Sequence, residues 1–282
     1  MDFLNNLFKG VVRTMITVEK QLLAAPRNQR YILTVTVIVL ILFLWSASAV
    51  SFNAMDENGR KVASNIIKGL INPDLNLLFN LSTQSVLYLL VETLAIAFLG
   101  TIVGSVLAIP LAFLSASNIV PKPVAWLVRL LLIIIRTIPA LVYGLMFIRV
   151  SGPGPFAGVL TIGLTSIGML AKLYVDAIED LDTRVLESMT SIGCTTFEKI
   201  RFGIVPQLLS LFLSVMIYRF DMNMREASVL GLVGAGGIGA PLIFAMRAYK
   251  WNEVGSILIG LVVLILIIEL LSNKLRSKLV KG

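Results

Sequence analysis

Residues 86–114 read VLYLLVETLAIAFLGTIVGSVLAIPLAFL and hold one charged side chain, Glu92. A helix that crosses the hydrocarbon of a bilayer needs about 20 mostly apolar residues, so this stretch predicts a membrane-spanning helix. Gly100 and Gly104 form a G-x-x-x-G pattern, which lets two helix backbones approach closely in a membrane. The stretch therefore predicts an all-α integral membrane protein in which this span packs tightly against a neighbour.

The composition of the whole chain agrees with that class. Of its 282 residues, 57% are hydrophobic and 14% are charged, and the mean hydropathy is +0.91, whereas a soluble domain averages about 25% charged residues. Residues 1–30 interleave apolar and basic side chains and are expected to form an amphipathic helix on the membrane face. Residues 31–282 are expected to form the membrane domain, with five further spans at 31–50, 124–149, 155–178, 207–225 and 254–272.

The orientation follows from the basic residues, because cytoplasmic loops carry an excess of Lys and Arg. Both ends of the chain are rich in them, so both are expected in the cytoplasm, which requires an even number of spans, and six fits. The net charge of +8 is assigned to the cytoplasmic membrane face rather than to nucleic acid. The protein is thus expected to be a multi-pass membrane protein, with loops 51–85 and 226–253 outside and loops 115–123 and 179–206 inside.

Several kinds of chemistry are excluded by residue content. The chain has no histidine and one cysteine, Cys194, so histidine metal sites, His-containing triads and an internal disulfide are ruled out. The sequence has no G-x-x-x-x-G-K-[ST] loop to bind ATP. We therefore expect neither a metal site nor a cofactor in this chain, and no enzymatic activity of its own.

The inner loop at 187–207, ESMTSIGCTTFEKIRFGIVPQ, has the pattern of two short amphipathic helices. The first is expected at about 182–191, and the second starts with one of the two threonines at 195–196 as its N-cap. Gly193 between them suits a helix end that needs a positive φ. Pro206 suits the first turn of the next membrane helix, where its missing N–H costs nothing. Local physics leaves two interpretations, a solvated loop or a ridge that docks on a soluble partner.

This loop resembles a signature of the permease subunits of bacterial ABC importers, E-A-A-x-x-x-G-x(9)-I-x-L-P. Glu187, Gly193 and Pro206 match it in identity and spacing. The sequence departs from the signature at both alanines, at the isoleucine and at the leucine, where it has Ser188, Met189, Gly203 and Val205.

Four longer segments make the chain similar to one group of these proteins, the phosphonate-importer permeases. They are LVETLAIAFLGTIVGSVLAIPLAFLSASN (90–118), RTIPALVYGLMF (136–147), GPGPFAGVLTIGLTSIGMLAKLYVDAIE (152–179) and NMREASVLGLVGAGGIG (223–239).

The resemblance implies a type I ABC-importer permease in the bacterial inner membrane, which imports phosphonates by alternating access. Its coupling loop, residues 179–206, would dock on a separate ATPase through Glu187, Ser188, Met189, Gly193, Val205 and Pro206. The implied partners are a second copy of the chain, a cytoplasmic ATPase dimer that binds ATP and Mg, an extracytoplasmic phosphonate-binding protein and membrane lipid.

Charges inside spans mark a pathway or an ion pair, because they are costly there. Arg225, which falls near the outer surface, is the first candidate for contact with an anionic substrate, since a guanidinium can hold two oxygens at once. Arg136 is the second, because Pro139 should kink or break its helix; the alternative is an internal pair, for example with Glu92. Asp221 lies four residues before Arg225 and can pair with it. Arg219 is expected to be structural.

The last glycine cluster, GAGGIG at 234–239, spells the G-x-G-x-x-G pattern of dinucleotide-binding folds. That fingerprint needs a preceding strand in a βαβ unit and an acid about 20 residues later, and neither is present here. Gly234, Gly236, Gly237 and Gly239 are instead expected to form a tight external turn between two spans. Their exposed N–H groups remain open as possible contacts for a phosphonate oxygen.

Other functions remain as alternatives. Within the same class, the solute could be phosphate, phosphite or an amino acid. Outside it, the candidates are a membrane-embedded enzyme, a channel or a secondary transporter. The first would need a clustered acid/base pair or metal site, and the last two leave the pattern of the coupling loop unexplained.

Overall fold

The computed structural model describes residues 29–49, 57–79 and 85–281. The amphipathic helix expected at 1–30 lies outside the described residues, except for Gln29 and Arg30, which open α2 (Gln29–Ala49). By its internal contacts the chain divides into residues 1–60 and 61–282. Helix α2 lies in the first part and coincides with the span expected at 31–50.

The rest of the described chain is a succession of helices. In chain order they are α3 (Glu57–Ile71), α4 (Leu75–Phe79), α5 (Val86–Ser115), α6 (Lys122–Thr137), α7 (Ala140–Ser151), α8 (Pro155–Glu179), α9 (Thr183–Ser191), α10 (Thr196–Glu198), the π-helical η2 (Lys199–Ile204), α11 (Val205–Gly231), α12 (Gly239–Arg247) and α13 (Trp251–Lys281).

The predicted spans are confirmed, with one important change. In the described residues, five helices are long and apolar enough to cross a membrane, and a sixth span results if α6 and α7 count as one broken span. The stretch expected as one span at 124–149 bends by 85° between these two helices. Pro139 is the cause, because it cannot donate to the carbonyl four residues earlier and it restricts Ile138 to extended backbone (φ −84°, ψ 125°).

Helices α5, α8 and α11 pack against one another at the centre of the bundle, and α5 and α8 share the most extensive contact between described helices. The glycine pair on α5 explains that closeness. A Cβ at Gly100 would lie 2.7 Å from Cβ of Ile162, and one at Gly104 would lie 2.6 Å from Cβ of Ser166. Neither position has room for a side chain, so the G-x-x-x-G interpretation is confirmed.

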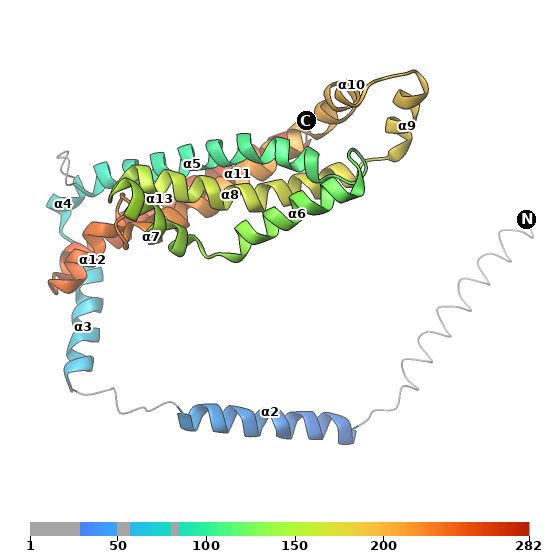
Figure 1. The fold of residues 1–282 in the computed structure, drawn as a ribbon. Helices are drawn as coiled ribbons and strands as arrows, with labels where there is room; N and C mark the ends of the chain where they lie inside the picture. Colours follow the sequence, from blue (N-terminus) through green and yellow to red (C-terminus); the bar gives the residue numbers. More distant parts are fainter. Residues whose placement is uncertain (1–28, 50–56, 80–84, 282) are drawn as a thin grey trace, which may run out of the picture. The chain divides into compact units, whose positions relative to one another are not determined.

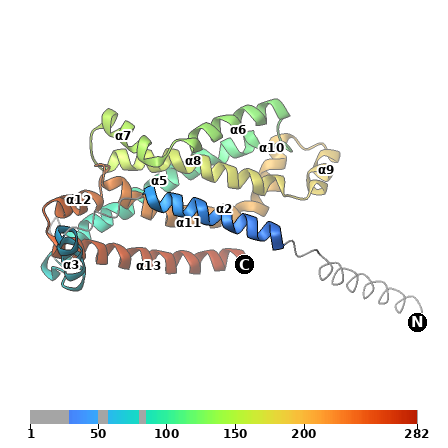
Figure 2. The ribbon, with the colours of Figure 1, turned by 90° about the horizontal axis from the view of Figure 1, so that it is seen from below.

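The bundle formed by residues 61–282 has two distinct ends (Figures 1 and 2). Helices α9 and α10 lie at one end, and α3, α4 and α12 lie at the other. Helix α13 runs from the α12 end back toward the α9 end. The C-terminal helix and the coupling loop therefore point to the same side of the bundle, as the sequence predicts.

Candidate functional site

Polar side chains on α11 reach into the centre of the bundle. Asn223 donates from Nδ2 to Oγ1 of Thr101 at 2.7 Å and to Oγ of Ser166 at 2.9 Å. All three side chains are buried. Polar groups at membrane depth face the bundle interior and pair with one another. This cluster therefore fixes α11 against α5 and α8.

Arg219, one turn before Asn223, has a hydrogen-bond partner at each of its three guanidinium nitrogens. Its Nε donates to Oγ of Ser166 at 3.2 Å, its Nη1 to Sδ of Met169 at 3.3 Å, and its Nη2 to Oε2 of Glu226 at 3.1 Å. The Arg219 side chain is 5% exposed, and that of Glu226 is 31% exposed. The guanidinium is therefore held in place inside the bundle, and the Glu226 carboxylate neutralises its charge.

Arg225 forms the expected pair with Asp221, at 2.8 Å between Nη2 and Oδ2. Glu269 of α13 lies 4.0 Å from the same nitrogen. The Arg225 side chain is 51% exposed, whereas that of Asp221 is 8% exposed. Arg225 therefore already compensates one buried carboxylate, and its contact with substrate stays a prediction.

Arg136 lies where the broken span begins to turn. Its alternative pair with Glu92 does not occur among the ion pairs of the described residues. Oε1 of Glu92 instead accepts the backbone N–H of Gly237 at 2.9 Å. Glu92 is thus an anchor for the glycine turn. The Arg136 stem instead packs over α8, where a Cβ at Gly168 would lie 2.6 Å from Cγ of Arg136.

A hollow of about 460 Å³ opens at the break between α6 and α7. In the described part of the chain it is lined by three basic side chains and one acidic side chain, together with apolar groups. Its lining is Ile135, Arg136, Ile138, Pro139, Ala140, Thr165, Met169, Lys172, Leu173, Arg219 and Glu226.

Lys172 is the member of this group that sequence reasoning missed. It lies within α8, in the segment GMLAKLYVDAIE. The rule that singled out Arg136, a charge inside a span, applies equally to Lys172. No proline or known motif lies beside Lys172, so the charge within an apolar helix is its one signal in the sequence.

A smaller hollow of about 240 Å³ adjoins the first. Arg136 and Lys172 line both hollows. The smaller one also contains Asp176 and Glu179. Glu179 accepts a hydrogen bond from the backbone N–H of Ser117 at 2.7 Å, which places this hollow toward the coupling-loop end of the bundle.

The coupling loop has the two short helices that its sequence predicts. Thr195 caps the second helix in a reciprocal arrangement with Glu198, which satisfies two helix-end donors. Gly193 has φ +86°, as a helix end in the left-handed region requires. Asp182 caps the first helix, and its hydrogen bonds from Arg184 lower the pKa of the Asp182 carboxyl. These caps give the loop a defined shape.

Two departures from the importer signature compensate each other. The signature has a small residue at 189 and a large one at 203, whereas this chain has Met189 and Gly203. A Cβ at Gly203 would lie 2.5 Å from Sδ of Met189. The methionine therefore occupies the space that the glycine leaves, and the ridge stays filled.

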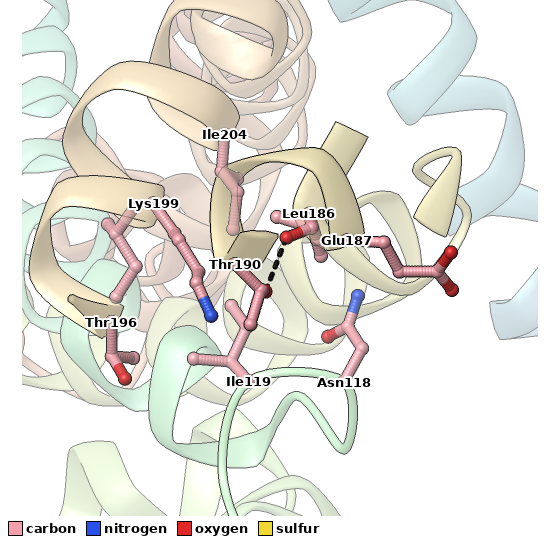
Figure 3. Close-up of a pocket in the computed structure, with 9 residues that line it drawn as sticks. Asn118, Ile119, Leu186, Glu187, Thr190, Thr196, Lys199 and Ile204 are labelled. Atoms are coloured by element: carbon pink, nitrogen blue, oxygen red, sulfur yellow. Dashed lines mark hydrogen bonds between the residues drawn. The ribbon is translucent and has the colours of Figure 1, made fainter. Parts of the chain in front are cut away.

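The remaining residues of the signature lie on α9 and at the start of α11. Glu187 and Ser188 are exposed on α9, and α11 begins at Val205 with Pro206 in its first turn. Figure 3 shows a hollow between α9, η2 and the 118–119 segment. In this view the Lys199 ammonium points into the hollow and the Glu187 carboxylate points away from it.

The glycine turn, residues 231–239, joins α11 to α12. Gly234, Gly236 and Gly237 have φ values of +99°, +82° and +73°. The turn is fastened to α5, since Thr93 Oγ1 accepts the N–H of Ile238 at 2.9 Å. Gly239 opens α12. The turn follows the span α11 as expected, but it leads into the short helix α12 rather than directly into the last span, α13. The Gly237 N–H is already bonded to Glu92.

Comparison with known proteins identifies the family to which the chain belongs. The model of the family "Binding-protein-dependent transport system inner membrane component" matches residues 108–280. The phosphite transport system permease protein PtxC of Stutzerimonas stutzeri is 35% identical over 189 residues, which cover 67% of this chain and 69% of that protein.

Two further relatives carry related names. The phosphate-import permease protein PhnE of Mycolicibacterium smegmatis is 35% identical over 67% of this chain and 36% of its own length. The putative cryptic phosphonate transport system permease protein PhnE2 of Escherichia coli is 33% identical over 42% of this chain and 97% of its own length.

A solved structure supports the architecture. The MetNI methionine ABC transporter, in an inward facing conformation, contains a chain that aligns with a TM-score of 0.58 and 18% identity, over 80% of this chain and 99% of that chain. That likeness supports the fold alone, and the sequence comparisons support the family. The chain is a membrane-spanning permease subunit that belongs to the binding-protein-dependent transport system inner membrane component family.

Proposed function

We propose that this permease imports phosphorus oxyanions, with phosphonates as the primary class and phosphite and phosphate as the closest alternatives. The observation that carries the proposal is the larger hollow, where Arg136, Lys172 and Arg219 face one carboxylate, Glu226, among the described residues. A net positive cavity at membrane depth favours an anion over a zwitterionic amino acid. The names of the relatives, which refer to phosphite, phosphate and phosphonate transport, support the same class.

The energy would come from a separate ATPase dimer that binds ATP and Mg. Its docking surface is the coupling loop, with Glu187, Ser188 and Met189 on α9, Gly193 at the turn, and Val205 and Pro206 where α11 begins. The caps that fix this loop support that role, because only a loop of defined shape passes a rigid-body movement to the membrane helices. The side on which α9 and the end of α13 lie is then the cytoplasm.

Two further partners complete the assembly. A second copy of the chain would form the other half of a symmetric path, and the open larger hollow would then face it. An extracytoplasmic binding protein would deliver the substrate at the opposite end, near the glycine turn and α12.

Reconstitution in liposomes tests the function. The permease, its ATPase and its binding protein are incorporated together, and the uptake of methylphosphonate, phosphite, phosphate and methionine is measured with ATP and with a non-hydrolysable analogue. We expect ATP-dependent uptake of methylphosphonate above that of the other three solutes. Uptake that continues without the ATPase would overturn the importer, and uptake of methionine alone would overturn the substrate class.

A further inference from the structure

The two hollows at the α6–α7 break meet at one pair of side chains. Arg136 and Lys172 line both the larger hollow of about 460 Å³ and the smaller hollow of about 240 Å³. A solute that moves between these hollows therefore passes both cations. This position is a junction rather than a closed pocket.

The other basic groups of the hollows already have partners. Arg219 is bonded to Ser166, Met169 and Glu226, and Arg129 is paired with Glu179. In contrast, Arg136 and Lys172 form no ion pair with any other residue of the described chain. These two are the cations whose charge is free for a solute.

Gly168 sets the position of the pair. The Arg136 stem lies on the bare backbone of Gly168, where a Cβ would approach Cγ of Arg136 to 2.6 Å. Lys172 is four residues further along α8, on the same helix face. The two side chains thus emerge side by side from the α6–α8 contact, one from each helix.

The broken span adds backbone donors at the same place. Helix α7 has 12 residues, begins at Ala140 in the lining of the larger hollow, and has Pro139 as its N-cap. Pro139 has no N–H, and the N–H of Val142 is bonded to the Pro139 carbonyl oxygen at 3.0 Å. The first-turn donors of α7 are therefore the N–H groups of Ala140 and Leu141, and the positive end of the helix dipole favours an anion beside them. These donors reinforce the two side chains.

We propose that Arg136 and Lys172, with the first turn of α7, form an anion subsite that binds the phosphorus oxyanion in transit. This inference rests on the proposed function and adds the residues that carry the substrate. The planar guanidinium of Arg136 takes two oxygens of the anion, and the Lys172 ammonium takes the third. On the coupling-loop side, Asp176 lies one turn beyond Lys172 and lines the smaller hollow, where its negative charge favours release.

The test uses the full complex of permease, ATPase and binding protein in liposomes, at saturating binding protein. It measures the number of methylphosphonate molecules imported per ATP hydrolysed. We expect Arg136→Gln and Lys172→Gln each to lower this ratio about tenfold, the size of one charge-assisted contact of about 1.4 kcal/mol. Arg149→Gln, which removes an exposed charge of α7 outside the lining of both hollows, should leave it within about twofold.

Two variants separate charge from structure. Arg136→Lys keeps the charge but loses the planar fork, so it should lower the ratio clearly less than Arg136→Gln, whereas Gly168→Ala keeps every charge but displaces the Arg136 stem and should lower the ratio about as much as Arg136→Gln. Binding is followed independently by the line broadening of the ³¹P signal of methylphosphonate with the solubilised permease–ATPase complex. The broadening should disappear in the Arg136→Gln/Lys172→Gln double variant.

The outcomes distinguish the two proposals. A wild-type complex that imports no phosphorus oxyanion overturns the proposed function. A wild-type complex that imports methylphosphonate, together with a double variant that retains both the ratio and the broadening, overturns the subsite alone. If the double variant loses its basal ATP hydrolysis, and so fails to assemble, the comparison of Arg136→Lys with Gly168→Ala replaces it. Equal numbers of methylphosphonate molecules imported per ATP in these two variants also overturn the subsite.

Discussion

Gly104 tests whether the contact between α5 and α8 controls the stability of the bundle. In Gly104→Ala, the new Cβ would lie 2.6 Å from Cβ of Ser166 and 2.8 Å from the carbonyl oxygen of Gly163. Carbon atoms in ordinary contact are about 3.5–4.0 Å apart. The two helices must therefore separate locally by about 1 Å to admit one methyl group.

The cost of that separation follows from the neighbouring contacts. Overpacking of this kind costs about 1–3 kcal/mol. Asn223 bridges the two helices with bonds of 2.7 Å to Thr101 and 2.9 Å to Ser166, and it cannot keep both bonds at these lengths if the gap opens by about 1 Å. The gain in helix propensity from Gly to Ala, up to about 1 kcal/mol, acts in the opposite direction. We expect a net loss of about 2 kcal/mol in the free energy of unfolding.

Gly163→Ala is the matched control, because it is the same substitution in the same helix pair. A Cβ there would meet Val103 Cγ1 at 3.5 Å and the Gly100 carbonyl oxygen at 3.7 Å, which are ordinary contacts. The free energy of unfolding is measured by titration with sodium dodecyl sulfate in mixed micelles, followed by circular dichroism. If Gly104→Ala is as stable as Gly163→Ala, the backbone contact does not limit the packing and the reasoning fails.

Three more perturbations have defined outcomes. Gly193→Val forces a β-branched residue to φ +86° and should abolish uptake in the reconstituted complex while the permease remains folded, whereas Gly193→Asn, which tolerates this region, should retain it. Glu226→Gln leaves the buried Arg219 without a charged partner and should lower the free energy of unfolding by about 2–3 kcal/mol; Arg219→Met/Glu226→Gln should recover most of this loss, and an additive double variant would contradict the pairing. Gly237→Ala would place a Cβ 2.6 Å from Oγ1 of Thr93 at a positive φ, so it should lower the thermal unfolding temperature in detergent; an unchanged temperature would mean that the turn relaxes freely.

The local features of the fold could be predicted from the sequence because their causes are local. Pro139 ends α6 through its own ring and the restriction it places on Ile138, and Gly193 and a threonine N-cap define the ends of two short helices through the residues next to them. The G-x-x-x-G pair identified a close helix contact. The pair did not identify α8 as the helix in contact, because residues 86–114 contain no information about which helix packs against them.

The contacts between distant residues could not be predicted in the same way. The suggested pair of Arg136 and Glu92 was plausible by charge, but Glu92 lies near the start of α5 and bonds to Gly237, far along the chain. Met189 and Gly203 looked like two independent departures from a signature, and only their spacing in three dimensions shows that one fills the space of the other. Pairing of this kind depends on how the helices cross, which a single sequence does not encode locally.

The continuous helix that leaves the coupling loop has a mechanical consequence. From Thr196 to Gly231 the chain is helical for 36 residues, a stiff rod about 54 Å long at 1.5 Å per residue. A tilt of only about 5° at one end of such a rod moves the other end by about 5 Å. That far end continues into the glycine turn, which is fastened to α5 through Glu92 and Thr93. A small tilt imposed at the loop therefore becomes, over the length of this helix, a larger displacement at the opposite mouth of the bundle.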